Sequence, residues 1–199
     1  MLEKPFSQAC ENNKNPILFH LKRVFKYSRS VLEIGSGTGQ HAVYFAQHMP
    51  TLNWQTTDLA INHNGIHLWL NEYPNKNVLP PIALDVTTYN WAIKTDAIYS
   101  ANTAHIMPWE AVVALFKGAG KALNNNGLFV LYGPFKYNGQ FSSASNARFD
   151  EHLRLNNPLQ GIRDYEKICA LAQNAGLQPI EDNPMPANNQ LLVFKKLAT

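Results

Sequence analysis

The most chemically specific pattern in the chain is a run of glycines that follows an acidic residue. Its members are Glu33, Gly35, Ser36, Gly37 and Gly39. A short apolar segment precedes the run and a helical pattern follows it, which is the context of a nucleotide-binding turn. Glycine permits positive φ and a close approach of backbone to ligand, and the start of the helix offers free N–H groups. The turn therefore predicts a bound nucleotide-like ligand.

Two further carboxylates end the next two expected strands. Asp58 lies 19 residues after Gly39, and Asp85 follows the strand after that. Because parallel strands present their carboxyl ends at one edge of a sheet, these acids should share a site with the glycines. A carboxylate at position 58 can accept hydrogen bonds from both hydroxyls of a ribose, and Asp85 would lie beside an adenine. We include the neighbouring Leu59 and Val86 in the predicted cofactor site.

Two cofactors fit the glycine turn. The spacing Gly37-x-Gly39-x-x-Ala42 satisfies the dinucleotide pattern and allows NAD. Glu33, however, is awkward beside a pyrophosphate and suits a cationic ligand, either by direct contact or by fixing the loop. The acid before the glycines and the two acids downstream favour S-adenosylmethionine over NAD.

Residues on the acceptor side should follow the fourth expected strand. Asn102 could touch the methionine end of the cofactor or orient an acceptor, and His105, which titrates near neutrality, could serve as a catalytic base. The alternative is structural, with Asn102 capping the turn and His105 packing beside Trp109.

These side chains need a sheet to bring them together, and the hydrophobic pattern predicts one. The expected strands are Ser30–Ile34, Leu52–Thr57, Val78–Leu84, Thr95–Ala101, Leu128–Tyr132, Leu177–Ile180 and Leu191–Lys195. The expected helices begin at Asn15-Pro16, Gly39, Asn62, Pro108 and Asp164. Strands alternating with helices predict a doubly wound α/β fold, and the two final strands predict an antiparallel addition at its edge. Residues 183–189 are too long for a tight hairpin, and residues 136–163 show no strong period.

Length and composition bound the function. The 199 residues predict a single domain, and 45% apolar residues supply its core. A net charge of +3 argues against nucleic acid as a partner. No apolar run is long enough to cross a membrane, and two cysteines outside any cluster fit a reducing cytoplasm. His63 and His67 have metal-ligand spacing without a third ligand nearby, so we expect no metal. The oligomeric state is left open.

The segment from Val31 to about Tyr132 resembles a class I S-adenosylmethionine-dependent methyltransferase. A closer resemblance, to a methyltransferase-like family long described as a domain of unknown function, covers nearly the whole chain. It is carried by residues 6–18, His105–Trp109, Tyr132–Phe135, Ser145–Asn146, Phe149–Asp150, Gly161–Asp164 and Met185–Asn189. The resemblance implies a Rossmann-like seven-stranded sheet of order 3-2-1-4-5-7-6 with the last strand antiparallel. It also implies that Asp58 holds the ribose, that Asp85 lies near the adenine amino group, and that the glycines line the methionine and ribose.

Outside such a core, two segments remain to build an acceptor pocket. We expect residues 1–29 to form an N-terminal helical lid and residues 136–163 a substrate-side insertion. The insertion carries Phe141, Arg148, Phe149, Asp150, Arg154, Arg163 and Asp164. These charges are either surface ion pairs or, if Arg148 or Arg163 lines the pocket, partners for an acceptor with a carboxylate or phosphate.

The sequence therefore predicts an S-adenosylmethionine-dependent methyltransferase that acts on a small molecule by in-line methyl transfer. Its fourth strand ends in Ser100-Ala-Asn-Thr, without the Asp/Asn-Pro-Pro-aromatic run of exocyclic-amine methyltransferases. The alternatives are a Rossmann-type NAD-dependent oxidoreductase and a non-catalytic S-adenosylmethionine-binding protein.

Overall fold

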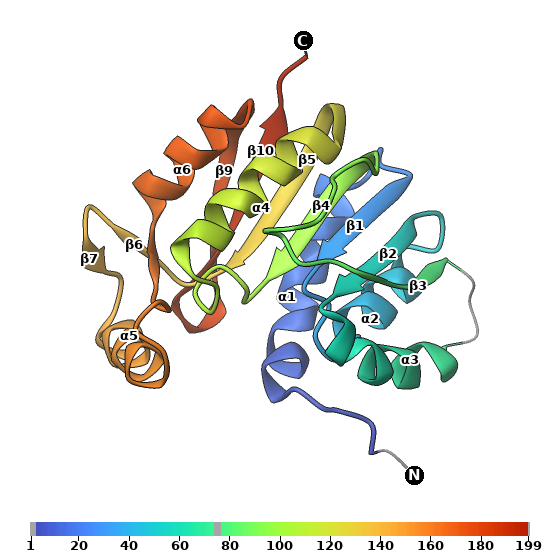
Figure 1. Ribbon diagram of the computed structural model, residues 1–199, viewed down its shortest axis with the longest axis horizontal. Helices are drawn as coiled ribbons and strands as arrows, with labels where there is room; N and C mark the ends of the chain where they lie inside the picture. Colours follow the sequence, from blue (N-terminus) through green and yellow to red (C-terminus); the bar gives the residue numbers. More distant parts are fainter. Residues whose placement is uncertain (1–2, 74–76, 199) are drawn as a thin grey trace.

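A seven-stranded sheet forms the centre of the computed structural model, which describes residues 3–73 and 77–198 (Figure 1). Its order is β3-β2-β1-β4-β5-β10-β9. The strands are β1 Ser30–Ile34, β2 Asn53–Asp58, β3 Val78–Ala83, β4 Thr95–Ala101, β5 Leu123–Gly133, β9 Leu177–Met185 and β10 Asn189–Lys196. All neighbours pair in parallel except β10, which is antiparallel to both β5 and β9. The expected order and the antiparallel last strand are confirmed.

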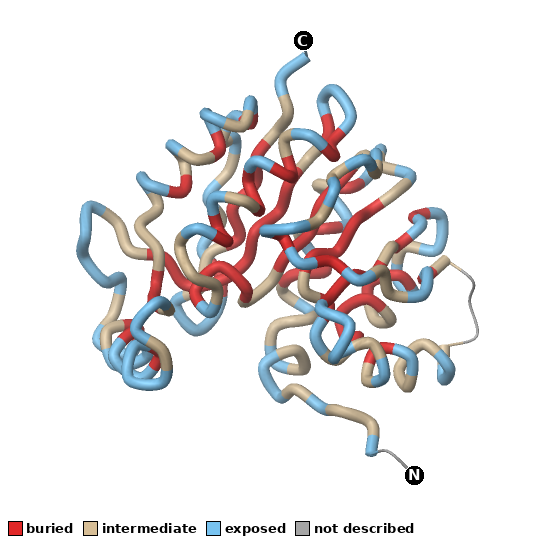
Figure 2. The backbone as a smooth tube through the Cα atoms, viewed as in Figure 1, coloured by how far each residue is buried: buried red, intermediate tan, exposed pale blue. Residues whose placement is uncertain are grey.

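Helices cover both faces of this sheet. They are α1 Gln8–Val24, α2 Gln40–His48, α3 His63–Asn71, α4 Trp109–Ala122, α5 Ala144–Asn156 and α6 Tyr165–Asn174. Helices α4 and α6 pack on one face and α1 and α2 on the other, which gives two apolar clusters. Strand β5 serves both, because Phe129 and Leu131 point to the first cluster and Val130 and Tyr132 to the second. Figure 2 shows the central strands as the most deeply buried part of the chain.

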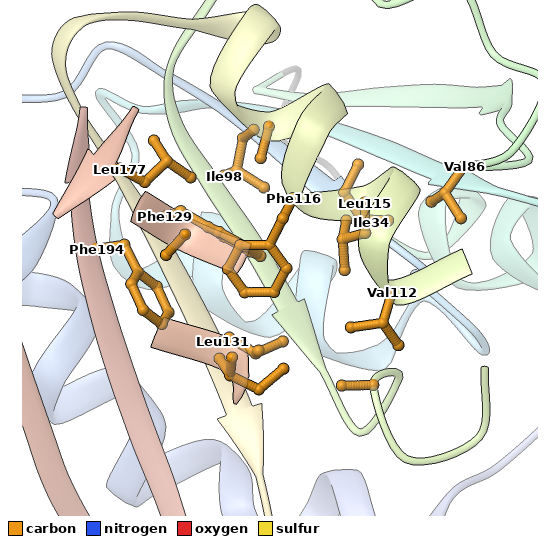
Figure 3. Close-up of a cluster of buried hydrophobic side chains, with 14 of the residues drawn as sticks. Ile34, Val86, Ile98, Val112, Leu115, Phe116, Phe129, Leu131, Leu177 and Phe194 are labelled. Atoms are coloured by element: carbon orange, nitrogen blue, oxygen red, sulfur yellow. The ribbon is translucent and has the colours of Figure 1, made fainter. Parts of the chain in front are cut away.

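The first cluster is dominated by aromatic packing between helix and sheet. Phe116 of α4 lies against Phe129 of β5 and Phe194 of β10, with ring centroids 5.2 and 5.5 Å away (Figure 3). Such edge-to-face pairs add stabilisation beyond the burial of their area. This packing fixes α4, and with it the turn after β4, relative to the sheet.

Helix α1 begins earlier than the sequence predicts. The expected start at Asn15-Pro16 is wrong, because the helix is capped by Ser7 and Pro16 lies inside it. A proline within a helix removes one backbone hydrogen bond, so the turns before it need support from elsewhere. They have it, since the amide oxygen of Gln40 accepts the backbone N–H of Ser7 and the ring of His41 bonds Asn13.

Strand pairing also overrode the local signal at two turns. Strand β5 begins at Leu123, five residues before the expected start at Leu128, and Asn126, with φ +64°, lies where its pairing with β4 shifts register. The expectation of a long separator at residues 183–189 is wrong as well. Met185 pairs directly with Asn189, and only Pro186–Asn188 connects the two strands. Because the exposed face of an edge strand carries polar residues, the sequence there lacks the apolar pattern from which a strand is predicted.

Residues 136–163 lie mostly in a small substructure beside the main sheet (Figure 1). Strands β6 Phe135–Tyr137, β7 Gln140–Phe141 and β8 Arg163–Asp164 form a three-stranded sheet, and α5 lies between β7 and β8 in the chain. Helix α5 is capped by Ser143, whose hydroxyl accepts the backbone N–H of Asn146. This arrangement places the first turns of α5 at the end of the main sheet that also carries the start of α1.

Candidate functional site

A cavity of about 970 Å³ opens where the carboxyl ends of the parallel strands meet. The strand order reverses between β1 and β4, which is where α/β sheets bind ligands. Ser7, Ala9 and Cys10 of α1, residues of α5, and the turn 187–189 between β9 and β10 complete the wall. The predicted site residues that line it are Glu33, Gly35, Ser36, Gly37, Asp58, Leu59, Asp85, Val86, Asn102 and His105. The fold thus gathers residues from five strand ends around one space.

Glu33, on β1, is a carboxylate buried beneath the glycine turn. It is 2% exposed, and its Oε2 accepts hydrogen bonds from Ser36 Oγ at 2.8 Å and Trp54 Nε1 at 3.0 Å. Burial raises the pKa of Glu33 to about 7, and the nearby charge of Asp58 adds to this, although the two hydrogen bonds act in the opposite direction. Of the two expected roles, fixing the loop is the one that these contacts display.

The glycine turn needs its glycines for different reasons. Gly37 has φ +57° and a Cβ there would have no atom within 4 Å, so its backbone is open on the cavity side. A Cβ on Gly35, at φ +73°, would lie 2.8 Å from Thr103 Cγ2, so this glycine allows β1 and the turn after β4 to touch. Gly39 does not line the cavity. It begins α2 at φ +90°, and a Cβ there would lie 3.2 Å from the Cα of Ile66, so the requirement for glycine is structural.

Asp58, at the end of β2, holds the turn through its carboxylate. Its Oδ2 accepts the backbone N–H of Gly37 at 2.7 Å. Its Oδ1 accepts both the backbone N–H of Leu59 and Nδ2 of Asn62, each at 2.7 Å. A carboxylate has about four acceptor positions, so one position on Oδ2 remains for a ligand. The sequence reasoning missed Asn62, although its place four residues after Asp58 at a helix start is a local signal for such a contact.

The neighbouring strand end offers apolar walls and a third carboxylate. Asp85 is exposed, and its Oδ1 accepts the backbone N–H and the hydroxyl of Thr87 at 2.9 and 2.6 Å. The hydroxyl and then the backbone hydrogen bond lower the pKa of Asp85. Leu59 is 49% exposed and Val86 is buried. An apolar pair beside a carboxylate is a suitable surface for a planar heterocycle with an amino group.

Asn102 lies at the end of β4 with a left-handed backbone at φ +58°. Its N–H donates to the carbonyl of Tyr132 at 2.9 Å, and its side chain has no hydrogen-bond partner within the described ranges. The next residue, Thr103, shares a hydrogen bond of 2.7 Å with Ser100, whose hydroxyl donates to the carbonyl of Ile34. The turn is therefore fixed by Thr103, and the amide of Asn102 is free toward the cavity that it lines.

His105 is 6% exposed and lies beside Phe149 rather than Trp109. The two ring centroids are 5.3 Å apart at 71°, an edge-to-face contact, while Trp109 lies near the guanidinium of Arg163. The expected packing of His105 against Trp109 is thus replaced by packing against α5. Burial lowers the pKa of His105 to about 4, with the charge of Arg163 acting in the same direction. The imidazole is therefore neutral at neutral pH.

A buried polar network that the sequence reasoning did not identify ties α1 to the cavity. His41 is 5% exposed, its Nε2 lies 2.7 Å from Asn13 Oδ1, and its Nδ1 lies 3.2 Å from the hydroxyl of Tyr99. Burial lowers the pKa of His41 to about 4. Since the carbonyl of Asn13 only accepts, Nε2 carries the hydrogen and Nδ1 accepts from Tyr99. Sequence alone gave no signal, because the partners come from α1, α2 and β4.

The charged residues of the insertion do not reach the cavity. Arg163 donates to the carbonyls of Ala104, Met107 and Leu159, and Arg154 pairs with Asp150 at 2.7 Å. Arg148 is exposed, and none of these arginines lines the cavity. The expectation that an arginine would bind an anionic acceptor there is therefore not supported, and the ion-pair alternative holds for Arg154. Phe149 is the residue of this set that does line the cavity.

Residues 3–73 and 77–198 contain no group of three His, Cys, Asp or Glu side chains placed to hold a metal ion. Within the same ranges, no helix has the length and apolar character that crossing a membrane requires.

Comparison with known proteins places the chain in a family. A family model described as "Protein of unknown function (DUF938)" matches residues 4–196. Among solved structures, an O-methyltransferase family protein from Burkholderia thailandensis is similar at TM-score 0.81 and 14% identity, covering 93% of this chain and 56% of that one. The S-adenosylmethionine-dependent methyltransferase SibL in its apo form is similar at TM-score 0.81 and 17% identity, covering 96% and 56%.

A structure described as "PigF with SAH" has TM-score 0.77 and 17% identity, covering 92% of this chain and 61% of that one. At such identities the likeness establishes a methyltransferase-like fold. The chain spans somewhat more than half the length of these three structures.

Proposed function

The chain belongs to the DUF938 family, and from that membership, its fold and the cavity described above we propose that it is an S-adenosylmethionine-dependent methyltransferase that acts on a small molecule. Residues 3–73 and 77–198 form a seven-stranded sheet with its covering helices and a small three-stranded sheet beside it. The cavity of about 970 Å³ suits a ligand of nucleoside size together with a small acceptor.

The charge of the cavity wall is the observation that carries this proposal. Three carboxylates line it, those of Glu33, Asp58 and Asp85, and none of the described lining residues is a lysine or arginine. A sulfonium cation is favoured in such a field, whereas the two negative charges of a pyrophosphate are not. The backbone N–H of Gly37, which a dinucleotide turn would direct to phosphate, is instead bonded to Asp58. The cavity thus favours S-adenosylmethionine over NAD.

The residues present fit that cofactor. The open position on Asp58 Oδ2 suits a ribose hydroxyl, Asp85 with Leu59 and Val86 suits an adenine, and the backbone at Gly37 is open to close approach. When bound, S-adenosylmethionine would supply a methyl group activated on a positively charged sulfur. The protein holds the reactants in line and excludes water.

On the acceptor side, His105 is the candidate for accepting the proton, and Asn102 is the candidate for orienting the reacting partners. An imidazole with a pKa near 4 is a weak base, but it is entirely in the neutral form at pH 7 and can accept a proton. A hydroxyl becomes strongly acidic as its oxygen is methylated, so a weak base is sufficient if the proton leaves late. The free amide of Asn102 would orient the reacting partners.

The two segments outside the core would form the acceptor half of the pocket. The first turn of α1 contributes Ser7, Ala9 and Cys10, in line with a lid formed by residues 1–29. The insertion of residues 136–163 contributes Ser145, Asn146 and Phe149. Both assignments belong to the proposal.

Calorimetry and methyl transfer together test it. We expect S-adenosylhomocysteine to bind and NADH not to bind, and we expect radiolabelled methyl transfer from S-adenosylmethionine into the small molecules of a cell extract. The variant Asp58→Asn should lose both, while Glu110→Gln, which removes an exposed carboxylate at the start of α4, should retain them. Binding of NADH alone would support the oxidoreductase instead. Binding of S-adenosylhomocysteine without any transfer would leave a non-catalytic binding protein.

A further inference from the structure

Asn146 of α5 is a buried amide whose nitrogen is fully committed. It is 5% exposed, and its Nδ2 donates to Ser142 Oγ and to the carbonyl of Asn188, both at 2.9 Å. An amide nitrogen carries two hydrogens, so these bonds fix the orientation of the side chain. Its Oδ1 has no partner among residues 3–73 and 77–198. Because Asn146 lines the cavity, this oxygen is a fixed hydrogen-bond acceptor that a ligand can use.

Asn189, at the start of β10, repeats this arrangement. Its Nδ2 donates to the carbonyls of Pro186 and Ala187 at 3.1 and 3.3 Å, and its Oδ1 likewise has no partner in the described part of the chain. In the turn that holds it, Ala187 and Asn188 both have φ +57°, and Asn188 Nδ2 donates to Ser145 Oγ at 3.2 Å, which joins the turn to α5. Asn189 also lines the cavity, so two fixed carbonyl oxygens flank the acceptor end.

No lysine or arginine is among the described residues that line the cavity, and three basic side chains in and beside the insertion are paired elsewhere. The guanidinium of Arg163 donates to three backbone carbonyls, Arg154 pairs with Asp150, and Lys136 Nζ lies 3.7 Å from Asp164 Oδ2. His105 is neutral at neutral pH. A carboxylate or phosphate placed here would leave water, meet no positive charge and lie beside two carbonyl oxygens, which makes its burial unfavourable.

The rest of the acceptor end is apolar. Ile106, Met107, Pro134 and Phe149 line it, and the edge-to-face contact with His105 holds the ring of Phe149 in place. Such walls suit the carbon skeleton of a ring or a short chain. The polar groups then require a hydrogen-bond donor on that skeleton, since a buried carbonyl oxygen without a partner is unfavourable.

From these contacts we infer that the methyl acceptor carries no negative charge and bears a hydroxyl group together with further hydrogen-bond donors, as a polyhydroxylated phenol or alcohol does, and that Asn146 and Asn189 select it. The inference rests on the proposed methyltransferase function and adds the class of its substrate. In the reaction a hydroxyl oxygen of the acceptor would give a lone pair to the methyl carbon, and the electron pair of the broken carbon–sulfur bond would stay on sulfur. The proton of that hydroxyl would pass to His105 and then to solvent, while other donors of the acceptor bond Asn146 and Asn189.

The charge of the acceptor can be tested before its identity is known. The small-molecule part of a cell extract is separated on a strong anion exchanger at pH 7, and each fraction is incubated with the protein and S-adenosylmethionine labelled in the methyl group. We expect at least 10-fold more label transferred in the unretained fraction. More label in the retained, anionic fraction would overturn the inference while leaving the methyltransferase function intact. No label in either fraction would count against both, and failure to bind S-adenosylhomocysteine would locate the fault in the proposed function.

The two asparagines can be tested with the active fraction. We expect Asn146→Ala and Asn189→Ala each to raise the KM for the acceptor about 10-fold, with the affinity for S-adenosylhomocysteine within twofold of wild type. The matched control is Arg148→Ala, which changes an exposed neighbour on α5 that does not line the cavity. Thermal unfolding identifies a variant that fails to fold. If one asparagine variant fails in this way, the KM of the other variant tests the inference. An unchanged KM in a folded variant would overturn the selection by that residue.

Discussion

The buried carboxyl of Glu33 should make the stability of this protein depend on pH in a way that one substitution removes. Its pKa is about 7 in the folded protein against an ordinary value of 4.5. Between these two pH values the folded chain keeps a proton that the unfolded chain has lost, so the free energy of unfolding falls as pH rises. Glu33→Gln replaces the carboxyl with a group of the same shape that does not titrate.

The size of the effect follows from that difference. From 4.5 to about 7 is about 2.5 pH units, which at 1.36 kcal/mol per unit corresponds to about 3 kcal/mol. We therefore expect Glu33→Gln to gain about 3 kcal/mol relative to wild type between pH 4 and pH 8. Any constant cost of fitting the amide beside Ser36 and Trp54 cancels in this comparison. For a chain of this length the gain corresponds to about 6–12 °C in Tm.

Urea unfolding of both proteins across this pH range measures the effect directly. The control is Glu110→Gln, which removes one exposed negative charge and should run parallel to wild type. The reasoning would be refuted if the wild-type and Glu33→Gln curves ran parallel from pH 4 to pH 8.

Three further predictions concern the wall of the cavity. Gly35→Ala should destabilise the protein by about 1–3 kcal/mol more than Gly37→Ala in urea unfolding, because both have positive φ but only Gly35 would meet Thr103, at 2.8 Å; equal losses would show that the contact relaxes at no cost. Asn13→Ala should lower the free energy of unfolding by about 1–3 kcal/mol, since it leaves the buried N–H of His41 without its acceptor, whereas substitution of the exposed neighbour, Asn12→Ala, should change it little. We expect faster hydrogen exchange confined to α1, and unchanged exchange would contradict this prediction. Protonation of His105, whose pKa is about 4, should leave methyl transfer unaffected from pH 8 down to pH 5 and suppress it only near pH 4; a wild-type decline centred near pH 6.5 that His105→Ala abolishes would show that the imidazole is not held neutral by burial.

Much of the fold could be predicted from the sequence because its signals are local. Buried strand segments such as Leu128–Tyr132 are continuous apolar runs, and the helices between the strands carry one apolar face. The signal failed where tertiary contacts replaced local ones. Pro16 lies inside α1 because Gln40 and His41 hold the turns before it, and residues 183–189 form a hairpin because β10 pairs with polar residues of β9.

The candidate site likewise has a part that could be predicted from the sequence and a part that could not. The glycine turn and the acids at strand ends were readable, because strand ends in a parallel sheet share an edge whatever the detailed packing. The acceptor half could not be predicted, since Asn146 is oriented by the carbonyl of Asn188, 42 positions away, and Arg163 donates to the carbonyl of Ala104, 59 positions away. Nothing in the local pattern of these residues distinguishes a lining side chain from a surface one.

The sequence by itself determined the sheet, its winding and the cofactor half of the cavity, because alternation, glycine spacing and strand-end acids are properties of neighbouring residues. Only the tertiary structure decided which polar groups of the cavity wall remain available to bond a ligand. It buries Glu33 beside Trp54, keeps His105 neutral against Phe149, and bonds Arg163 to backbone carbonyls. Burial and hydrogen-bond commitment depend on residues far apart in the chain, and they set the charge that a ligand meets.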